Sequence, residues 1–379
     1  MNVSVYEGID TLPARVLAWA EAAGSPDFLS GLAWLRAFFA LELETDARPR
    51  LYCADVDGEP VALLPMQTPA ARAGSAFRHR RRFGPTLSAA TSFQTCTFSP
   101  ILCADAARAA EGLRACLDHI ARRERHWSWI DFNALDPDAP WFGALIAAAR
   151  AAGYAVRAYP HFPNRFERYA HADLASCLAE RAPEDRKQFQ NYERKWRKLQ
   201  RESGAVFRFV GSPADDIDRA VGAYEAVHAR SWKAPDRSPE FVPRILREAF
   251  AAGVLRMGIL EAEGRPVAVE VGIARPGGVT MLKTAYDEAL RERSVGAVVI
   301  LRTIEQLIAG DGVREIDFGR DDEPYKRLWM PQCRLRQGVA AFDPRQPGGL
   351  YGLLAEASDT ALRWTKARVR PILRPVATK

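Results

Sequence analysis

The sequence predicts a mixed α/β fold of two tandem domains, in which mostly antiparallel central sheets are flanked by helices. The chain has 379 residues, which exceeds one ordinary core and fits two domains of roughly 150–200 residues. One plan of elements also occurs twice in the same order: opening helices, a hairpin, a long helix, and a strand that ends in Ile-Asp-Phe. Helices and antiparallel strands closed by a strand–helix–strand unit are typical of mixed α/β layers.

Three landmarks define the repeat. Each half contains a predicted hairpin, at 51–66 and at 255–274, in which an acidic residue and a glycine form the turn between apolar strands. Pro-Val-Ala follows the turn in both copies. Each half then has a helical pattern that runs into Ile-Asp-Phe, at 130–132 and at 316–318. Three matching landmarks in one order indicate a duplication.

The C-terminal half gives the clearer pattern of elements. Proline stands at or near the start of each opening helix, where its missing N–H costs nothing. We predict these helices at 183–202, 213–231 and 239–252. Strands are then expected at 254–261, 265–274 and 278–286, a helix at 296–309, and strands at 314–319 and 333–342. The predicted domains are 1–165 and 166–349, followed by a basic helical tail at 350–379.

Composition favours a cytoplasmic protein. Apolar residues make up 48% of the chain and charged residues 26%, which is the balance of a soluble globular protein. No apolar run approaches the ~20 residues that cross a bilayer, and the first ten residues are acidic where a signal peptide would be basic. The six cysteines are scattered without a CxxC pair, so we expect reduced thiols and no metal site.

The segment 316–329, IDFGRDDEPYKRLW, contains the most specific motif. Ile-Asp-Phe-Gly is followed by an acidic loop, Tyr325, Lys326 and Trp329, and a helix beginning near Gly296 precedes it. This order resembles the GNAT acyltransferase superfamily. The tandem arrangement resembles its Fem-like group, which includes acetyltransferases linked to cellulose and exopolysaccharide synthesis. The resemblance covers nearly the whole chain, in outline only for the first half. It implies two GNAT-like domains, with acetyl-CoA or another acyl-CoA as co-substrate.

The turn RERSVGA at 291–297 leaves a predicted strand and opens a predicted helix. Exposed backbone N–H groups at such a turn, together with the helix dipole, suit a pyrophosphate. The acyl-CoA loop of the superfamily, Gln/Arg-x-x-Gly-x-Gly/Ala, matches Arg291, Ser294 and Gly296, with a serine at the first glycine position that can still cap the helix. The alternative is an ordinary capped helix. The cofactor-binding residues that the resemblance implies are Arg291, Arg293, Ser294, Val295, Gly296 and Ala297.

The first half lacks this turn. The stretch FSPILCAD before Ala106 contains no glycine and no basic residue. We therefore expect the N-terminal domain to bind no cofactor and to form a wall of the acceptor groove.

Acyl transfer needs a proton acceptor, a stabilised carbonyl oxygen and a proton donor. In GNAT-like folds splayed strands offer a backbone N–H for the oxygen, here expected from 281–284. Tyr325 resembles the general acid, and the alternative for it is packing beside Trp329. Glu270 interrupts the apolar strand VAVEVGIA and is the expected carboxylate base.

Two more residues are catalytic candidates. Lys326 is expected to pair with Asp317 or to bind an anionic acceptor, unless it is a surface lysine. Asp317 ends a buried-looking strand, as Asp131 does in the first copy, so a structural carboxylate that accepts backbone hydrogen bonds is the alternative for it.

The acceptor is expected to contact a helix and a loop. His228 and Trp232 are four residues apart on a predicted helix and therefore share a face. The resemblance places this helix near the acceptor groove, and a packed histidine is the alternative. Tyr286 and the loop acids Asp321 and Asp322 complete the expected acceptor-binding residues.

Three basic segments, 78–82, 186–201 and 363–375, point to an anionic partner. The helix at 186–201 has seven basic residues and one acid around an aromatic stripe. It is either a docked amphipathic helix with a solvated basic face, or a contact for tRNA, CoA phosphates or an anionic membrane surface. Contact with an anionic membrane surface would place the protein peripherally at the inner membrane face. No DNA partner is expected.

Three functions are open at this point. The first is an acyl-CoA-dependent N- or O-acyltransferase whose acceptor is an amino sugar, a polysaccharide precursor or an amino-acid-like metabolite. The second is a Fem-type transferase that uses aminoacyl-tRNA. Such enzymes commonly insert a long helical hairpin, for which the basic helix is too short. The third is a non-catalytic tandem scaffold, which would be expected to lose the turn at 294–297.

Overall fold

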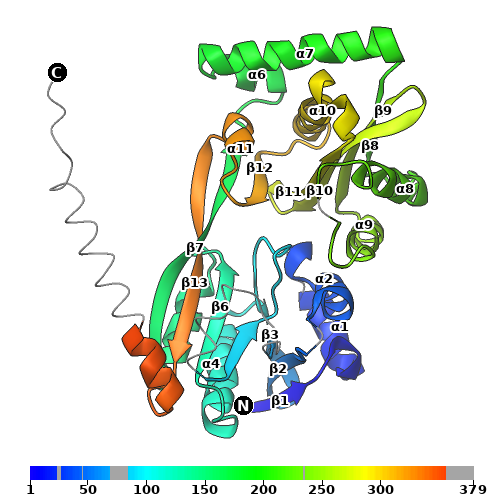
Figure 1. Ribbon diagram of the computed structural model, residues 1–379. Helices are drawn as coiled ribbons and strands as arrows, with labels where there is room; N and C mark the ends of the chain where they lie inside the picture. The colour runs from blue at the N-terminus through cyan, green and yellow to red at the C-terminus, as the bar shows by residue number, and fades with distance from the viewer. Residues whose placement is uncertain (24–26, 45, 69–83, 234, 356–379) are drawn as a thin grey trace, which may run out of the picture.

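The computed structural model describes residues 1–23, 27–44, 46–68, 84–233 and 235–355. Within these residues a 13-stranded sheet runs through both halves of the chain, with helices on its faces (Figure 1). The basic segments at 78–82 and 363–375, and most of the predicted tail, lie outside the described residues. None of the described helices is both long and apolar enough to cross a bilayer.

The first half follows the predicted plan. Its part of the sheet contains β1 Asn2–Tyr6, β2 Pro49–Val56, β3 Glu59–Gln67, β4 Thr86–Ala89 and β6 Trp129–Leu135, and the short β5 Ile101–Leu102 pairs with β3. The helices are α1 Ala14–Ala23, α2 Leu32–Ala37, α4 Ala106–Arg123 and α5 Phe142–Ala151. The hairpin turns at Asp57 and Gly58, which both have positive φ (51° and 85°), as a tight two-residue hairpin turn requires.

The second half matches the predicted elements closely. Its helices are α6 Leu174–Ala179, α7 Pro183–Ser203, α8 Ile217–His228, α9 Phe241–Ala251, α10 Val295–Ala309 and α11 Pro324–Trp329. Its strands are β8 Val206–Val210, β9 Leu255–Ala262, β10 Arg265–Arg275, β11 Gly278–Tyr286 and β12 Glu315–Arg320. The hairpin again turns at an acidic residue and a glycine with positive φ, Glu263 (53°) and Gly264 (74°).

The two halves repeat an unusual feature, a short parallel pair in a mostly antiparallel sheet. β4 pairs in parallel with β6, where Ser88 lies opposite Asp131. β11 pairs in parallel with β12, where Thr280 lies opposite Asp317. Both aspartates belong to the Ile-Asp-Phe landmarks. The predicted tandem α/β fold is therefore confirmed at the level of strand register.

Two long strands join the halves. β7 Ala155–Arg168 pairs with β12 of the second half, and β13 Gln332–Phe342 lies between β6 and β7 (Figure 1). The predicted boundary at 165/166 therefore falls inside a continuous strand. A division by chain position also assigns β13 to the second domain, whereas β13 pairs with β6 of the first. The pairing of β13 with β6 joins residues that are far apart in the sequence, and local sequence patterns do not encode such contacts.

Helices of the two halves share one apolar core. Residues of α1 and α2 cluster with residues of α8 and α9, and Trp34 packs edge-on against Phe241 with ring centroids 5.2 Å apart. Both rings are almost fully buried. This packing fixes the first half beside the cavity described below.

Candidate functional site

A cavity of about 630 Å³ opens where β11 and β12 separate. The two strands pair only from Gly278 to Thr280, so the backbone from Met281 onward has no partner strand on that side within the described chain. The register with β10 also shifts by one residue, leaving Leu282 as a β-bulge. Backbone groups at 281–284 therefore face the gap, as splayed GNAT-like strands are expected to do.

Five parts of the second half line this cavity. They are β11, the start of α10, the β12–α11 segment, one face of α7, and the segment after α8 with Trp232 and Lys233. The first half adds a sixth surface through Phe93, Gln94 and Cys96. The cavity therefore lies at the junction of the two halves, and its size is typical of a small-molecule site.

One end of the cavity is the N-terminus of α10. Ser294 stands at the N-cap position in the left-handed region, with φ 56°, and its side chain does not cap the helix. The predicted serine cap is thus absent. The Ser294 hydroxyl instead accepts a hydrogen bond of 2.7 Å from Lys195 Nζ of α7. The first N–H groups of α10 have no side-chain cap, so they remain available for an anion.

The structure gives a reason for a glycine at position 296 that the sequence did not reveal. A Cβ atom at this position would lie 2.7 Å from Cδ1 of Tyr286. The glycine therefore makes room for the Tyr286 ring, rather than only for a ligand. Both residues line the cavity.

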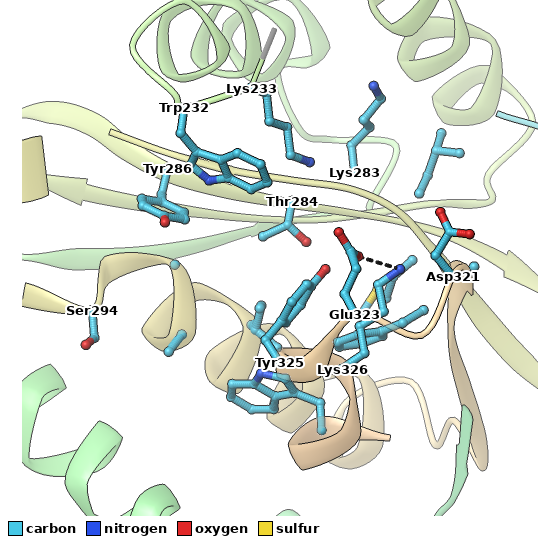
Figure 2. Close-up of a pocket in the computed structure, with 18 of the residues that line it drawn as sticks. Trp232, Lys233, Lys283, Thr284, Tyr286, Ser294, Asp321, Glu323, Tyr325 and Lys326 are labelled. Carbon is cyan, nitrogen blue, oxygen red and sulfur yellow. Dashed lines mark ion pairs between the residues drawn. The ribbon is translucent and has the colours of Figure 1, made fainter. Parts of the chain in front are cut away.

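Tyr325 lies at the middle of the cavity, across from Thr284 (Figure 2). Desolvation raises the pKa of the phenol, and the nearby carboxyl groups of Glu270 and Glu323 raise it further. Solvent reaches 43% of the residue, which weakens these effects without reversing them. The phenol therefore keeps its proton at neutral pH, as a general acid must before it reacts.

Glu270 is fully buried. It is opposite Thr284 in the β10–β11 register, and Thr284 lines the cavity. Desolvation raises the Glu270 pKa to about 8, while Thr284, Lys233 and Lys326 lower it. Neither carboxyl oxygen has a well-formed hydrogen bond within the described residues. Glu270, the predicted base, does not itself line the cavity; its side chain lies on the same face of the sheet as that of Thr284.

Comparisons with known proteins agree with the fold and the cavity described above. Residues 186–327 match the model of the acetyltransferase (GNAT) domain. The matched residues run from α7 to α11 and include most of the cavity lining. No curated protein matches the sequence.

Solved structures extend the fold likeness to the whole chain. FemX has a TM-score of 0.55 at 10% identity, over 93% of this chain and 99% of FemX. The C-terminal domain of a candidate lysylphosphatidylglycerol synthetase from Agrobacterium fabrum has 0.53 at 11%, over 93% and 95%. L-PGS from Bacillus licheniformis has 0.50 at 14%, over 88% and 93%. At these identities the likeness shows a common fold.

The turn at 291–297 places four of its six predicted cofactor residues on the cavity: Arg291, Ser294, Gly296 and Ala297. Val295 is fully buried in the core. Arg293 points away and pairs with Glu202 at 3.2 Å. These two residues do not line the cavity, because successive side chains of a tight turn point in different directions.

Lys326 lines the cavity but is only 6% exposed. Its ammonium donates to the carbonyl of Arg320 and pairs with Glu323 at 3.0 Å (Figure 2). It does not pair with Asp317, contrary to one of its two predicted roles. Its contacts hold the β12–α11 loop in place.

Asp317 lies outside the cavity, although it was predicted among the catalytic residues. It accepts hydrogen bonds from Arg334 at 2.9 Å, from the Thr280 hydroxyl at 3.3 Å and from the Gly319 N–H at 3.0 Å. With 2% exposure it is a structural carboxylate at the end of β12. This is the alternative that the sequence left open.

Two predicted acceptor residues are also engaged elsewhere. Asp322 pairs with Arg165 at 2.7 Å and with Arg327 at 2.8 Å, which lowers its pKa. His228 stacks on Tyr224, and burial lowers its pKa. It shares no face with Trp232, because α8 ends at His228 and not at 231 as predicted.

Trp232, Tyr286 and Asp321 do line the cavity. Trp232 is 54% exposed, so its indole ring is accessible from the cavity. Asp321 has φ 74°, a strained backbone for a residue other than glycine, and this turn directs the acidic loop toward the cavity.

Several cavity residues were not predicted. Lys233 follows Trp232 directly, and Lys283 lies on β11, where its charge in an apolar strand was an available signal. No local pattern marks Phe93, Gln94 and Cys96, because they reach the cavity only through packing of the two halves.

Proposed function

We propose that this protein is an acyl-CoA-dependent acyltransferase that transfers an acetyl group to an amine or hydroxyl of a small-molecule acceptor. The observation that supports this best is the course of the cavity. It leads from the uncapped N-terminus of α10, past the splayed backbone of 281–284, to the Tyr325 phenol (Figure 2). When bound, acyl-CoA would supply an activated thioester.

The residues present fit such a ligand. The first N–H groups of α10, with Lys195 and Arg291 beside them, would hold a pyrophosphate. Backbone N–H groups at 281–284 would stabilise a carbonyl oxygen that gains negative charge. Tyr325 holds a proton at Oη as general acid. Glu270 would accept the proton that the acceptor loses, through the Thr284 hydroxyl.

In the described part of the first half, the corresponding helix start offers no equivalent anion site, which supports a cofactor site in the second half. The helix that corresponds to α10 is α4, and Asp105 caps it by accepting from the N–H groups of Ala107 and Arg108. A carboxylate at this position occupies the N–H donors and repels phosphate. The first half therefore contributes a wall to the cavity.

Thermal unfolding tests the proposal. A ligand that binds only the folded state stabilises it by ~2.7 kcal/mol at a concentration 100-fold above its Kd. We expect acetyl-CoA or CoA to raise the Tm at millimolar concentration, and tRNA to leave it unchanged. A response to tRNA without a response to CoA would instead support the aminoacyl-tRNA-dependent function.

Arg291→Ala should weaken CoA binding about tenfold, because one charge-assisted contact contributes roughly 1.4 kcal/mol. Isothermal titration with CoA measures this effect. The matched control is Arg293→Ala, since Arg293 is two residues away but points out of the cavity toward Glu202. Equal losses in the two variants would indicate a general charge effect and not the proposed loop.

A further inference from the structure

The cavity has more positive than negative side chains. Its described lining contains two carboxylates, Asp321 and Glu323, against six cations: Lys195, Lys233, Lys283, Arg291, Arg320 and Lys326. Two of these cations, Lys195 and Arg291, lie at the α10 end, where a pyrophosphate would neutralise them. The excess at the other end needs another explanation.

Protein carboxylates already pair with two of the remaining lysines. Lys283 pairs with Asp236 at 2.8 Å, and Lys326 pairs with Glu323 at 3.0 Å. Lys233 differs from both. Within the described residues no carboxylate lies at ion-pair distance from its ammonium, and its nearest ring contact is Trp232, 5.6 Å from Nζ to the ring centroid.

Lys233 is also partly buried. Burial lowers the pKa of its ammonium, and Lys283 lowers it further. A charge held in such surroundings without a partner is costly, and an anion bound beside it removes most of that cost. Glu270, Glu323 and Asp236 are the acids whose field reaches Lys233, but each is buried or paired with another lysine.

The position of Lys233 suits an acceptor and not the cofactor. Figure 2 shows Lys233 across Thr284 from Tyr325, and remote from Ser294 at the α10 end. Lys283 is next to Thr284 on β11. An acceptor whose anionic group lay against Lys233 would therefore extend toward the reacting centre between Thr284 and Tyr325.

We infer that the acceptor carries a carboxylate or phosphate group, and that Lys233 binds it and so determines acceptor specificity. Because this inference rests on the proposed acyl transfer, it deepens that function and does not replace it. Neutral amino sugars and neutral amines would then be poor acceptors. An amino acid or a sugar phosphate would meet the requirement, and the test separates the two.

The first test uses simple anions on the CoA-saturated protein. Acetate and inorganic phosphate are compared with chloride at equal ionic strength, and the Tm is measured for wild type and variants. We expect one of the two anions to raise the wild-type Tm, with no response in Lys233→Gln and a retained response in Lys233→Arg. Acetate identifies a carboxylate acceptor, and phosphate identifies a phosphorylated one.

Lys198→Gln is the matched control, since this lysine lies on α7 and pairs with Glu202 outside the cavity. It should respond as wild type does. An identical anion response in wild type and Lys233→Gln would overturn the inference. If CoA does not raise the Tm of the wild type, the proposed function itself is refuted. The two failures are therefore distinguishable.

A second readout is kinetic. Thiol release is followed with paired acceptors, glucosamine 6-phosphate against glucosamine, and an amino acid against its amide. We expect the anionic member to have at least a tenfold advantage in kcat/KM, which Lys233→Gln removes by raising KM. A loss confined to kcat in both Lys233→Gln and Lys233→Arg would instead make Lys233 a proton acceptor and contradict an anchoring role.

Discussion

Tyr325→Phe should lower kcat by about 10²–10⁴-fold while leaving acyl-CoA binding intact, because the variant removes only the proton that a general acid supplies. The phenol faces the middle of the cavity, and its pKa is raised, so it is protonated at neutral pH. Single-turnover kinetics measures the chemical step, and the Tm increase with CoA measures binding.

The control for this variant is Tyr192→Phe. Tyr192 also lines the cavity, but its ring stacks on Trp329 at 5.6 Å, a contact that phenylalanine retains. We expect turnover close to wild type. Full activity of Tyr325→Phe under conditions where chemistry limits the rate would refute its role as general acid.

Glu270→Gln should have opposite effects on activity and stability. The raised pKa means that the folded state binds a proton more tightly than the unfolded state does. Stability of the wild type therefore falls as the pH rises from about 4.5 to about 8, and the cost is complete above that range. At pH 7 the cost is roughly 3 kcal/mol, since one pKa unit corresponds to about 1.4 kcal/mol.

Glutamine cannot ionise, so Glu270→Gln should have a higher Tm than wild type, and the difference should widen between pH 5 and pH 8. If Glu270 accepts the acceptor's proton, wild-type kcat/KM rises with pH through an apparent pKa near 8. The variant should then have a much lower kcat/KM, and this value should no longer rise with pH. A variant that gains stability but keeps the wild-type pH–rate profile would show that Glu270 is structural.

Thr284→Val distinguishes a relay from direct proton transfer. The variant retains the shape of the side chain but lacks the hydroxyl that would carry a proton from the cavity to Glu270, the register partner of Thr284. If Thr284 relays the proton, Thr284→Val should lower the rate about as much as Glu270→Gln does.

Local patterns were sufficient to predict most elements of the second half. The hairpin around Glu263 and Gly264 and the helix after Ser294 occur within one or two residues of the predicted bounds. These elements depend on turn residues and on the spacing of apolar side chains, which are legible in one sequence. The pairing of β13 with the first half depends on contacts between residues far apart in the chain. No turn residue and no spacing of apolar side chains predicts it.

The site was less predictable than the fold for a physical reason. Asp317 and Lys326 are charged residues in a specific motif, and both serve structural networks. Lys233 lies in no motif, yet at the end of the cavity away from α10 it is the lysine without a carboxylate at ion-pair distance among the described residues. Sequence identifies residue types that can react, but the partners that neutralise a charge come from other elements. Burial and pairing therefore decide which charge is available to a ligand.

A crystal structure of the complex with CoA tests the central claim most directly. We predict that the pyrophosphate lies within hydrogen-bond distance of the N–H groups at 295–297, with Lys195 beside it and the thiol directed toward Tyr325. Density for CoA at the Asp105-capped start of α4, or at any site away from α10, would contradict the proposed function.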